Sequence, residues 1–215
     1  MGWLGTKCER ITLNLGMKIF LLILLLLGGC MAKREPSDHT ISLRQLDAGA
    51  HSSSEGAEQY GRAALRAADE GQVEAERLFR ALSYSEQVHE LRFVEAILQL
   101  GGEYHPPQVL YVRVRSTEEN LQEAMCPTRL RQPLQRVEGI DRVIQEGNRY
   151  VARLLIRYAA ADNRRLRLLS SYSPGEISGQ QHYLVCPRCG YLCEERFSDP
   201  FCPQCYLSEA YFKRF

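Results

Sequence analysis

The sequence lacks the surplus of basic residues that would attract it to a nucleic acid. Its 27 Lys and Arg residues are balanced by 26 Asp and Glu residues, which leaves a formal charge of +1. A near-neutral chain has no electrostatic basis for binding a polyanion, so we expect no nucleic acid partner. Proline and glycine are not enriched either, with 9 and 16 residues among 215, and this argues against a disordered chain. The length suits one domain of ordinary size plus a small module.

A continuous apolar run long enough to cross a bilayer is also missing. The run over residues 19–27 is too short to span a membrane as a stable helix. It follows Met17-Lys18 and ends in Leu-Gly-Gly-Cys30, and this order of a positive start, an apolar run and small residues indicates a secretory signal. The last four residues resemble the lipobox of bacterial lipoproteins, which implies cleavage before Cys30 and a diacylglycerol on its sulfur. We therefore expect an exported lipoprotein that is anchored to a membrane.

This interpretation assigns the N-terminal region to export rather than to the fold. Residues 1–29 form the signal peptide, with Met17 as the better initiator, and residues 30–40 form a polar, lipid-anchored tether. An uncleaved N-terminal anchor and an ordinary signal remain as alternatives.

Two cysteine pairs near the C-terminus share a spacing that is typical of a metal site. The chain contains Cys186-Pro-Arg-Cys189 followed by Gly190, and then Cys202-Pro-Gln-Cys205. Each Cys-x-x-Cys pair forms a tight knuckle that turns two sulfurs toward one ion, and two knuckles complete a tetrahedron. Glycine after the first pair suits the positive φ that such a knuckle often needs. Disulfides remain the alternative, although they explain neither the doubled spacing nor the matching prolines.

Four of the eight cysteines fall outside this motif. Cys8 and Cys30 lie in the leader or at its edge, and Cys126 and Cys193 are left over. Cys193 closely follows the first knuckle, so it is either a spare thiol or a small buried or surface residue.

The region before the cysteine motif has the apolar periodicity of helices. We predict helices over residues 41–69, 72–99, 117–145 and 148–171. Pro127 and Pro133 predict that the third helix is kinked or broken, and Ser116 or Thr117, with Glu119 nearby, predicts its N-terminal cap. Two short-loop hairpins joined by a long crossover predict a mainly α fold, a ferritin-like four-helix bundle. The arginines of the fourth helix that we assign to a solvated face are Arg149, Arg153, Arg157, Arg164 and Arg167.

With both regions in view, the sequence resembles the rubrerythrin family. The C-terminal motifs that carry the resemblance are Tyr183-Leu-Val-Cys186-Pro-Arg-Cys189-Gly-Tyr191, Cys202-Pro-Gln-Cys205 and Ala210-Tyr211-Phe212. Those in the helical region are Tyr60, Glu70-Gly71, Glu86-Gln-Val-His89, Glu119-Asn120-Leu121 and Glu146-Gly147. The resemblance implies a ferritin-like bundle over 41–171, a linker over 172–182 and a small rubredoxin-like four-cysteine β module over 183–215. It also implies a homodimer that pairs head to tail.

The resemblance implies peroxide reduction only where the bundle holds two irons. Glu86 and His89 match two of the family's iron ligands in the second helix. The other ligand positions fall on Ser53, Thr128, Arg131, Asp162 and Arg165. Asp162 is a shortened substitute and the other four are lost, so we expect no di-iron centre and leave enzymatic activity open.

In place of the irons we predict a metal-free network of ion pairs at mid-bundle. Glu86 and Asp162 are expected to pair with Arg131 and Arg165, with His89 nearby. A guanidinium can supply the counter-charge that a buried carboxylate needs. A single iron or zinc held by Glu86, His89 and Asp162 is the alternative.

The four-cysteine site leaves the choice between iron and zinc open, because both ions accept this geometry. The resemblance implies one rubredoxin-type iron, which would make the chain a one-electron carrier that serves a redox partner protein. Export argues against such an iron site, since an oxidising compartment promotes disulfides unless metal is loaded first. The sequence thus predicts either an anchored electron-transfer protein or a non-redox binding or structural lipoprotein with zinc as a folding clip.

Overall fold

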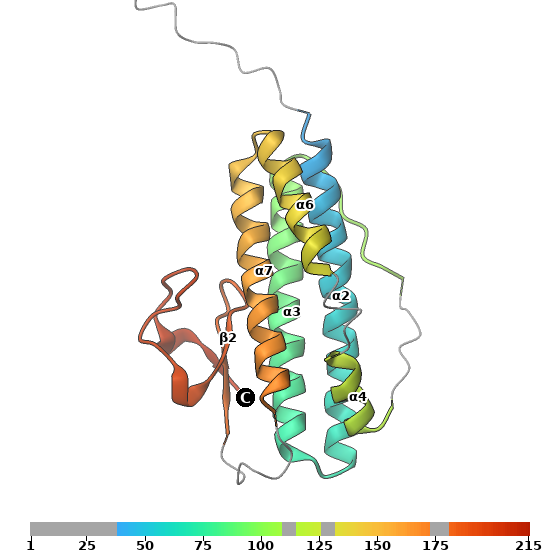
Figure 1. The fold of residues 1–215 in the computed structure, drawn as a ribbon, viewed down its shortest axis with the longest axis vertical. Helices are drawn as coiled ribbons and strands as arrows, with labels where there is room; N and C mark the ends of the chain where they lie inside the picture. Colours follow the sequence, from blue (N-terminus) through green and yellow to red (C-terminus); the bar gives the residue numbers. More distant parts are fainter. Residues whose placement is uncertain (1–37, 109–114, 126–131, 173–180) are drawn as a thin grey trace, which may run out of the picture. The chain divides into compact units, whose positions relative to one another are not determined.

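The computed structural model describes residues 38–108, 115–125, 132–172 and 181–215, with only the backbone for 132–136. It separates Met1–Asp38 from a compact unit formed by His39–Phe215. Most of this unit is a helical bundle, and its C-terminal part is a small β module (Figure 1). Within the described ranges, no helix is long and apolar enough to cross a membrane. The predicted signal peptide and most of the tether, including Cys30, lie outside these ranges.

The first two helices form a hairpin with apolar facing sides. α2 (Thr40–Asp69) and α3 (Val73–Gln99) match the predicted bounds to within a residue. The stripe that α2 buries contains Leu46, Ala50, Ser53, Ala57, Tyr60, Ala64 and Ala67. These residues recur every three or four positions, so they share one side of the helix. The chain reverses at Gly71, whose φ of 70° is left-handed and is adopted freely by glycine.

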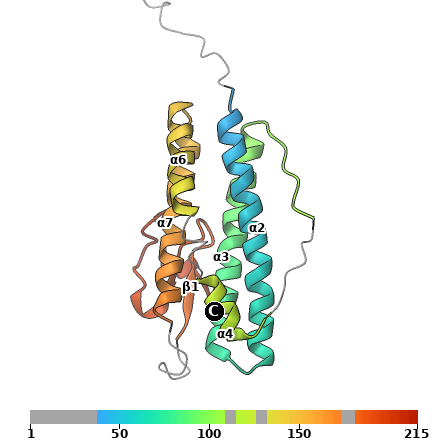
Figure 2. The same ribbon diagram turned by 45° about the vertical axis from the view of Figure 1, so that its right-hand side comes forward.

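The first half of the second hairpin contains two described helices. The structure describes α4 (Thr117–Ala124) and α6 (Gln132–Gln145) where the sequence predicted one kinked or broken helix, and α7 (Arg149–Ser170) follows. α4 ends before Pro127, and Pro133 lies in the first turn of α6, where proline costs no helical hydrogen bond. Figures 1 and 2 show α4 beside α2 and α6 beside α7. Pro133 therefore suits the start of α6, whereas Pro127 lies outside the described residues.

A glutamate from each hairpin turn caps a helix of the other hairpin. Glu70 Oε2 accepts a hydrogen bond of 2.9 Å from Thr117 N at the start of α4. Glu146 accepts hydrogen bonds of 2.8 and 2.9 Å from Ile41 N and Ser42 N at the start of α2. A carboxylate at a helix N-terminus satisfies N–H groups that have no intrahelical partner and complements the helix dipole. The two hairpins are therefore tied together at both ends of α2.

Polar residues divide the bundle interior into two apolar clusters. One cluster includes Phe79 and Leu82, and the other includes Phe93 and Ile97. The buried polar residues between them are Ser53, Glu86, His89 and Asp162. Together with Arg165 we call these residues the mid-bundle polar group. Because buried polar side chains cost free energy unless they are paired, this group marks a candidate site.

Three short strands form the β module. β1 (Tyr183–Val185) lies between β2 (Leu192–Glu194) and β3 (Lys213–Arg214), and it pairs antiparallel with both. Residues of β1 and β2 also belong to the apolar cluster around Phe79, so the bundle and the module share a core. The predicted fold class, a mainly α bundle followed by a small C-terminal β module, is confirmed.

Candidate metal centre

Four cysteine thiols meet at one end of the β module. The ligand atoms of Cys186, Cys189, Cys202 and Cys205 all lie within 4.8 Å of one another. The sulfurs of Cys186 and Cys205 lie 3.5 Å apart, and so do those of Cys189 and Cys202. A disulfide needs about 2.05 Å, so these thiols are free in the structure, which favours the metal site over the disulfide alternative. An ion about 2.3 Å from each of four sulfurs separates them by about 3.8 Å, so the cluster fits a tetrahedral metal.

Equivalent backbone turns shape the two knuckles. Gly190 N donates to Cys186 O at 2.9 Å in the first, and Tyr206 N donates to Cys202 O at 2.9 Å in the second. Gly190 and Tyr206 have left-handed φ values of 74° and 59°. Glycine adopts this conformation freely, whereas a tyrosine pays about 1–2 kcal/mol for it. The matched turns direct both pairs of sulfurs toward one centre.

Thiols this close cannot ionise independently. Hydrogen bonds from Cys186 and Cys189 lower the pKa of Cys202 to about 2, because they favour its thiolate. Hydrogen bonds with Cys186 and Cys202 raise the pKa of Cys189, because they hold its proton. A bound cation would favour all four thiolates at once, so the cluster suits a metal better than a lone nucleophile.

Cys193 lies near this cluster but outside it. It is buried on β2, opposite Leu184 of β1. Burial raises the pKa of its thiol to about 11. A buried, protonated thiol is a poor nucleophile and a poor ligand, so the structure supports the small buried residue rather than the spare thiol.

One side of α3 holds the first knuckle. Ser85 Oγ donates to Gly190 O at 2.6 Å, and Arg92 Nε donates to Arg188 O at 2.7 Å. His89 lies between Ser85 and Arg92 on the helix, with its ring against Gly190. A Cβ at position 190 would lie 2.9 Å from Ser85 O and closer still to the His89 ring, so only glycine fits here. The knuckle is therefore fixed to the bundle through its own backbone.

Arg165 joins two carboxylates of the mid-bundle polar group. Its guanidinium forms ion pairs with Glu86 on α3 and Asp162 on α7. Arg165 thus lies between the two acids. Thr128 and Arg131, the ligand positions of the third helix, lie outside the described residues.

His89 is buried between this ion pair and the first knuckle. Its Nδ1 is 3.5 Å from Glu86 Oε2, and its ring packs edge-on against Tyr158 with centroids 4.9 Å apart. Burial lowers the pKa of His89 to about 4, a decrease that the Cys189 backbone partly opposes. His89 Nε2 has no hydrogen-bond partner among the described residues. The buried hydroxyl of Ser53 also has none there. The imidazole is therefore neutral near pH 7.

The mid-bundle polar group is not arranged as a metal site in the part of the chain that the structure describes. Among those residues, the four cysteines alone form a group of three or more His, Cys, Asp or Glu ligands close enough to share an ion. Glu86, His89 and Asp162 do not form such a group. The alternative of a single ion held by these three residues therefore has no support in the structure.

Arg164 corrects the predicted solvated face of the fourth helix. Its side chain is half-buried, and its buried Nε has no hydrogen-bond partner among the described residues. The prediction is wrong for Arg164 because the β module covers this part of α7.

The roles of Ser85 and Arg92 were not predicted from the sequence. Their helical spacing from His89 was the one available signal.

No protein-family model and no curated protein matches this sequence. Solved structures do match. The chain has the fold of nigerythrin. A fully reduced, all-ferrous state of nigerythrin matches with a TM-score of 0.70 at 20% identity, and a mixed-valence state with 0.72 at 21%. A partially reduced state gives 0.69 at 20%, and each match covers 81% of this chain and 86% of the nigerythrin chain.

The likeness to nigerythrin spans both the bundle and the four-cysteine module. It confirms the rubrerythrin-like fold that the sequence motifs predicted. At about one-fifth identity, this likeness shows the fold alone.

Proposed function

We propose that the chain is an electron-transfer protein that carries one iron in its four-cysteine site. The observation that carries this proposal is the cluster of four free thiols within 4.8 Å of one another. The likeness to nigerythrin favours iron over zinc, because one of the matching nigerythrin structures is all ferrous. Iron bound by four thiolates supplies a one-electron change.

The chain's own residues hold and tune such a site. Besides the neighbouring thiols, the backbone N–H groups of Gln204 and Cys205 favour the thiolate of Cys202. The backbone of Tyr191 does the same at Cys189. Hydrogen bonds to sulfur stabilise negative charge at the ligands and thereby adjust the reduction potential. The contacts from α3 keep the first knuckle in place during a change of charge.

We propose further that Arg165 replaces metal as the counter-charge in the bundle. A guanidinium stays protonated at any ordinary pH, so it neutralises Glu86 and Asp162 permanently. A fixed positive charge between these acids opposes the binding of two iron cations at the same place. The peroxide reduction of the rubrerythrin family is therefore not expected, and the electron acceptor or donor is a separate redox protein.

The location and assembly of the protein are proposed from the sequence. Export and a lipid on Cys30 would place the protein at a membrane surface, where it would meet its redox partner. Head-to-tail pairing of two chains is proposed from the resemblance to rubrerythrins.

A zinc-stabilised, non-redox lipoprotein is the second candidate. The apolar cluster that the β module shares with the bundle is consistent with this candidate. A redox-inert zinc ion would stabilise this joint core as well as iron would.

A redox titration of the purified protein distinguishes the two functions. The iron protein is expected to be red, to bleach with one electron per chain and to recover on reoxidation. Cys205→Ser should abolish these bands, whereas Cys193→Ser, which changes a cysteine outside the cluster, should preserve them. A colourless zinc protein would overturn the electron-transfer proposal.

A further inference from the structure

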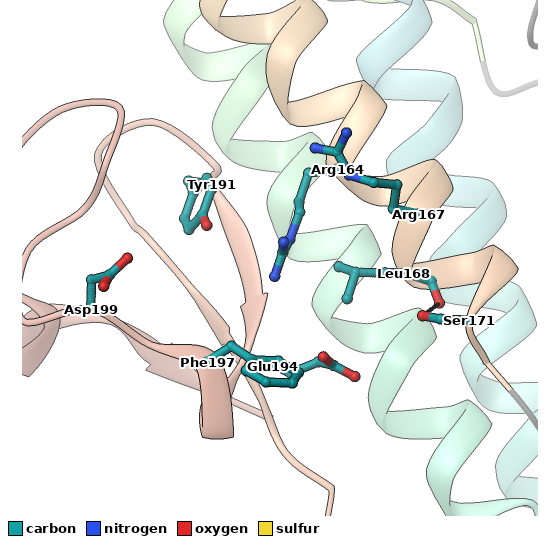
Figure 3. A pocket seen from close by; sticks show the side chains of 8 residues that line it. All are labelled: Arg164, Arg167, Leu168, Ser171, Tyr191, Glu194, Phe197 and Asp199. Carbon is teal, nitrogen blue, oxygen red and sulfur yellow. Dashed lines mark hydrogen bonds between the residues drawn. The ribbon is translucent and has the colours of Figure 1, made fainter.

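A cavity lies between α7 and the β module, beside the first knuckle. Its volume is about 500 Å³, and Figure 3 shows the side chains that line it. This volume falls within the range of small-molecule sites. The proposed electron transfer through the cysteine cluster makes no use of the cavity.

The walls of the cavity carry unpaired positive charge. Arg164 and Arg167 line it from α7, and neither forms an ion pair with any residue that the structure describes. Arg164 reaches from α7 toward the module (Figure 3), and its buried Nε has no hydrogen-bond partner in the described ranges. A buried guanidinium donor without an acceptor is costly, so this side chain is suited to an anionic ligand.

The acidic residues of the cavity do not cancel this charge. Glu194 is buried in the wall, but it already pairs with Arg196 at 3.2 Å and accepts a hydrogen bond from Gln181. Asp199 and Arg167 are both exposed to solvent, where their charges are screened. Half-buried Arg164 therefore remains as the positive charge inside the cavity that no acidic residue of the lining neutralises.

Aromatic and apolar side chains complete the walls. Tyr191 and Phe197 line the module side, and Leu168 lines the α7 side. Phe197 is 59% exposed, so its ring is accessible to a molecule from solvent. Aromatic rings and guanidinium groups both stack on flat ring systems.

We propose that this cavity binds a planar aromatic molecule that carries a phosphate or carboxylate group. Arg164 and Arg167 bind the anionic group, and Tyr191 and Phe197 contact the ring. Tyr191 O accepts a hydrogen bond of 2.9 Å from Cys186 N, so the ligand lies directly beside the first knuckle. The binding does not depend on whether the cysteines hold iron or zinc.

Titration of the zinc-loaded protein with FMN and with riboflavin tests the site. The two probes share a ring system, and only FMN carries a phosphate. We expect FMN to bind at least about tenfold more tightly than riboflavin, as expected for a charged hydrogen bond. Zinc cannot exchange electrons, so the outcome is independent of the proposed electron transfer.

Variants of α7 identify the residue that recognises the phosphate. Arg164→Gln is expected to weaken FMN binding about tenfold or more and to remove most of the preference over riboflavin, whereas Arg164→Lys retains part of it. Arg153→Gln, at an exposed position of α7 outside the cavity, is the control and keeps wild-type affinity. If Arg164→Gln lowers the melting temperature, Arg167→Gln replaces it with the same expected loss. The proposal is overturned if FMN does not bind, if riboflavin binds equally well, or if the variants bind like the control.

Discussion

At the scale of single residues, Arg165 is the positive partner of two buried carboxylates. Its side chain is 14% exposed, and the paired Glu86 and Asp162 side chains are 3% and 5% exposed. Two carboxylates this deeply buried need a positive charge close by. We infer that the chain supplies this charge itself.

Arg165→Met is expected to destabilise the fold by about 3–5 kcal/mol, because both carboxylates stay buried without a counter-charge. Urea unfolding at pH 7 measures the change in the free energy of unfolding. Arg153→Met, on an exposed position of the same helix, should change it by less than about 0.5 kcal/mol. If the two variants lose the same amount, another cation must neutralise the acids.

Gly190→Ala is expected to separate the first knuckle from α3. The added Cβ would lie 2.9 Å from Ser85 O, and a φ of 74° disfavours alanine. We expect a loss of more than about 2 kcal/mol in unfolding free energy and faster removal of metal by a chelator.

Gly71→Ala is the matched control for this prediction. Its φ is 70°, but a Cβ there would meet nothing within 4 Å, so the cost should be only about 1 kcal/mol. Equal losses at positions 71 and 190 would show that the contact between knuckle and α3 contributes nothing.

At the scale of elements, the helices could be predicted from the sequence, but not the surfaces that they cover. Apolar periodicity located α2, α3 and α7, and the capping box of Ser116 and Glu119 starts α4 as expected. The contacts of Ser85 and Arg92 and the half-burial of Arg164 were not predicted. Each depends on where the β module packs, and helical spacing does not reveal which element covers a given face.

The cap that Glu70 provides to α4 is expected to make stability depend on pH. Hydrogen bonds from Thr117 lower the pKa of Glu70 below its ordinary value of 4.5. Because the folded pKa is the lower one, the cap contributes fully above the unfolded pKa and is lost as the pH falls through the folded value.

Glu70→Gln should therefore lower the melting temperature near pH 7, with a difference from wild type that narrows as the pH falls from about 5 toward 2. Thermal unfolding followed by circular dichroism measures this difference. Glu103→Gln, at an exposed position, should match wild type throughout. A difference that stays constant with pH would contradict the role of the Glu70 carboxylate.

At the scale of the whole molecule, the metal site and the bundle depend on one apolar core. Strands β1 and β2 contribute to the same cluster as Phe79 and Leu82, and the first knuckle contacts α3 next to the mid-bundle polar group. The structure of the module should therefore affect the stability of the helices.

Removing the metal is expected to lower the melting temperature of the helical signal, because binding to the folded state alone stabilises the joint core. Circular dichroism at about 222 nm, with and without chelator, measures the shift. Cys205→Ser should resemble the chelated protein, and Cys193→Ser should still respond to chelator. A melting temperature of the helical signal that chelator leaves unchanged would show that the bundle and the module unfold independently.

The metal content of the purified protein tests the central claim most directly. Elemental analysis against protein quantified by amino-acid analysis should find one iron per chain, and Cys205→Ser should remove it. Two or more additional irons per chain would show that the bundle binds metal despite Arg165, and zinc in place of iron would contradict the proposed electron transfer.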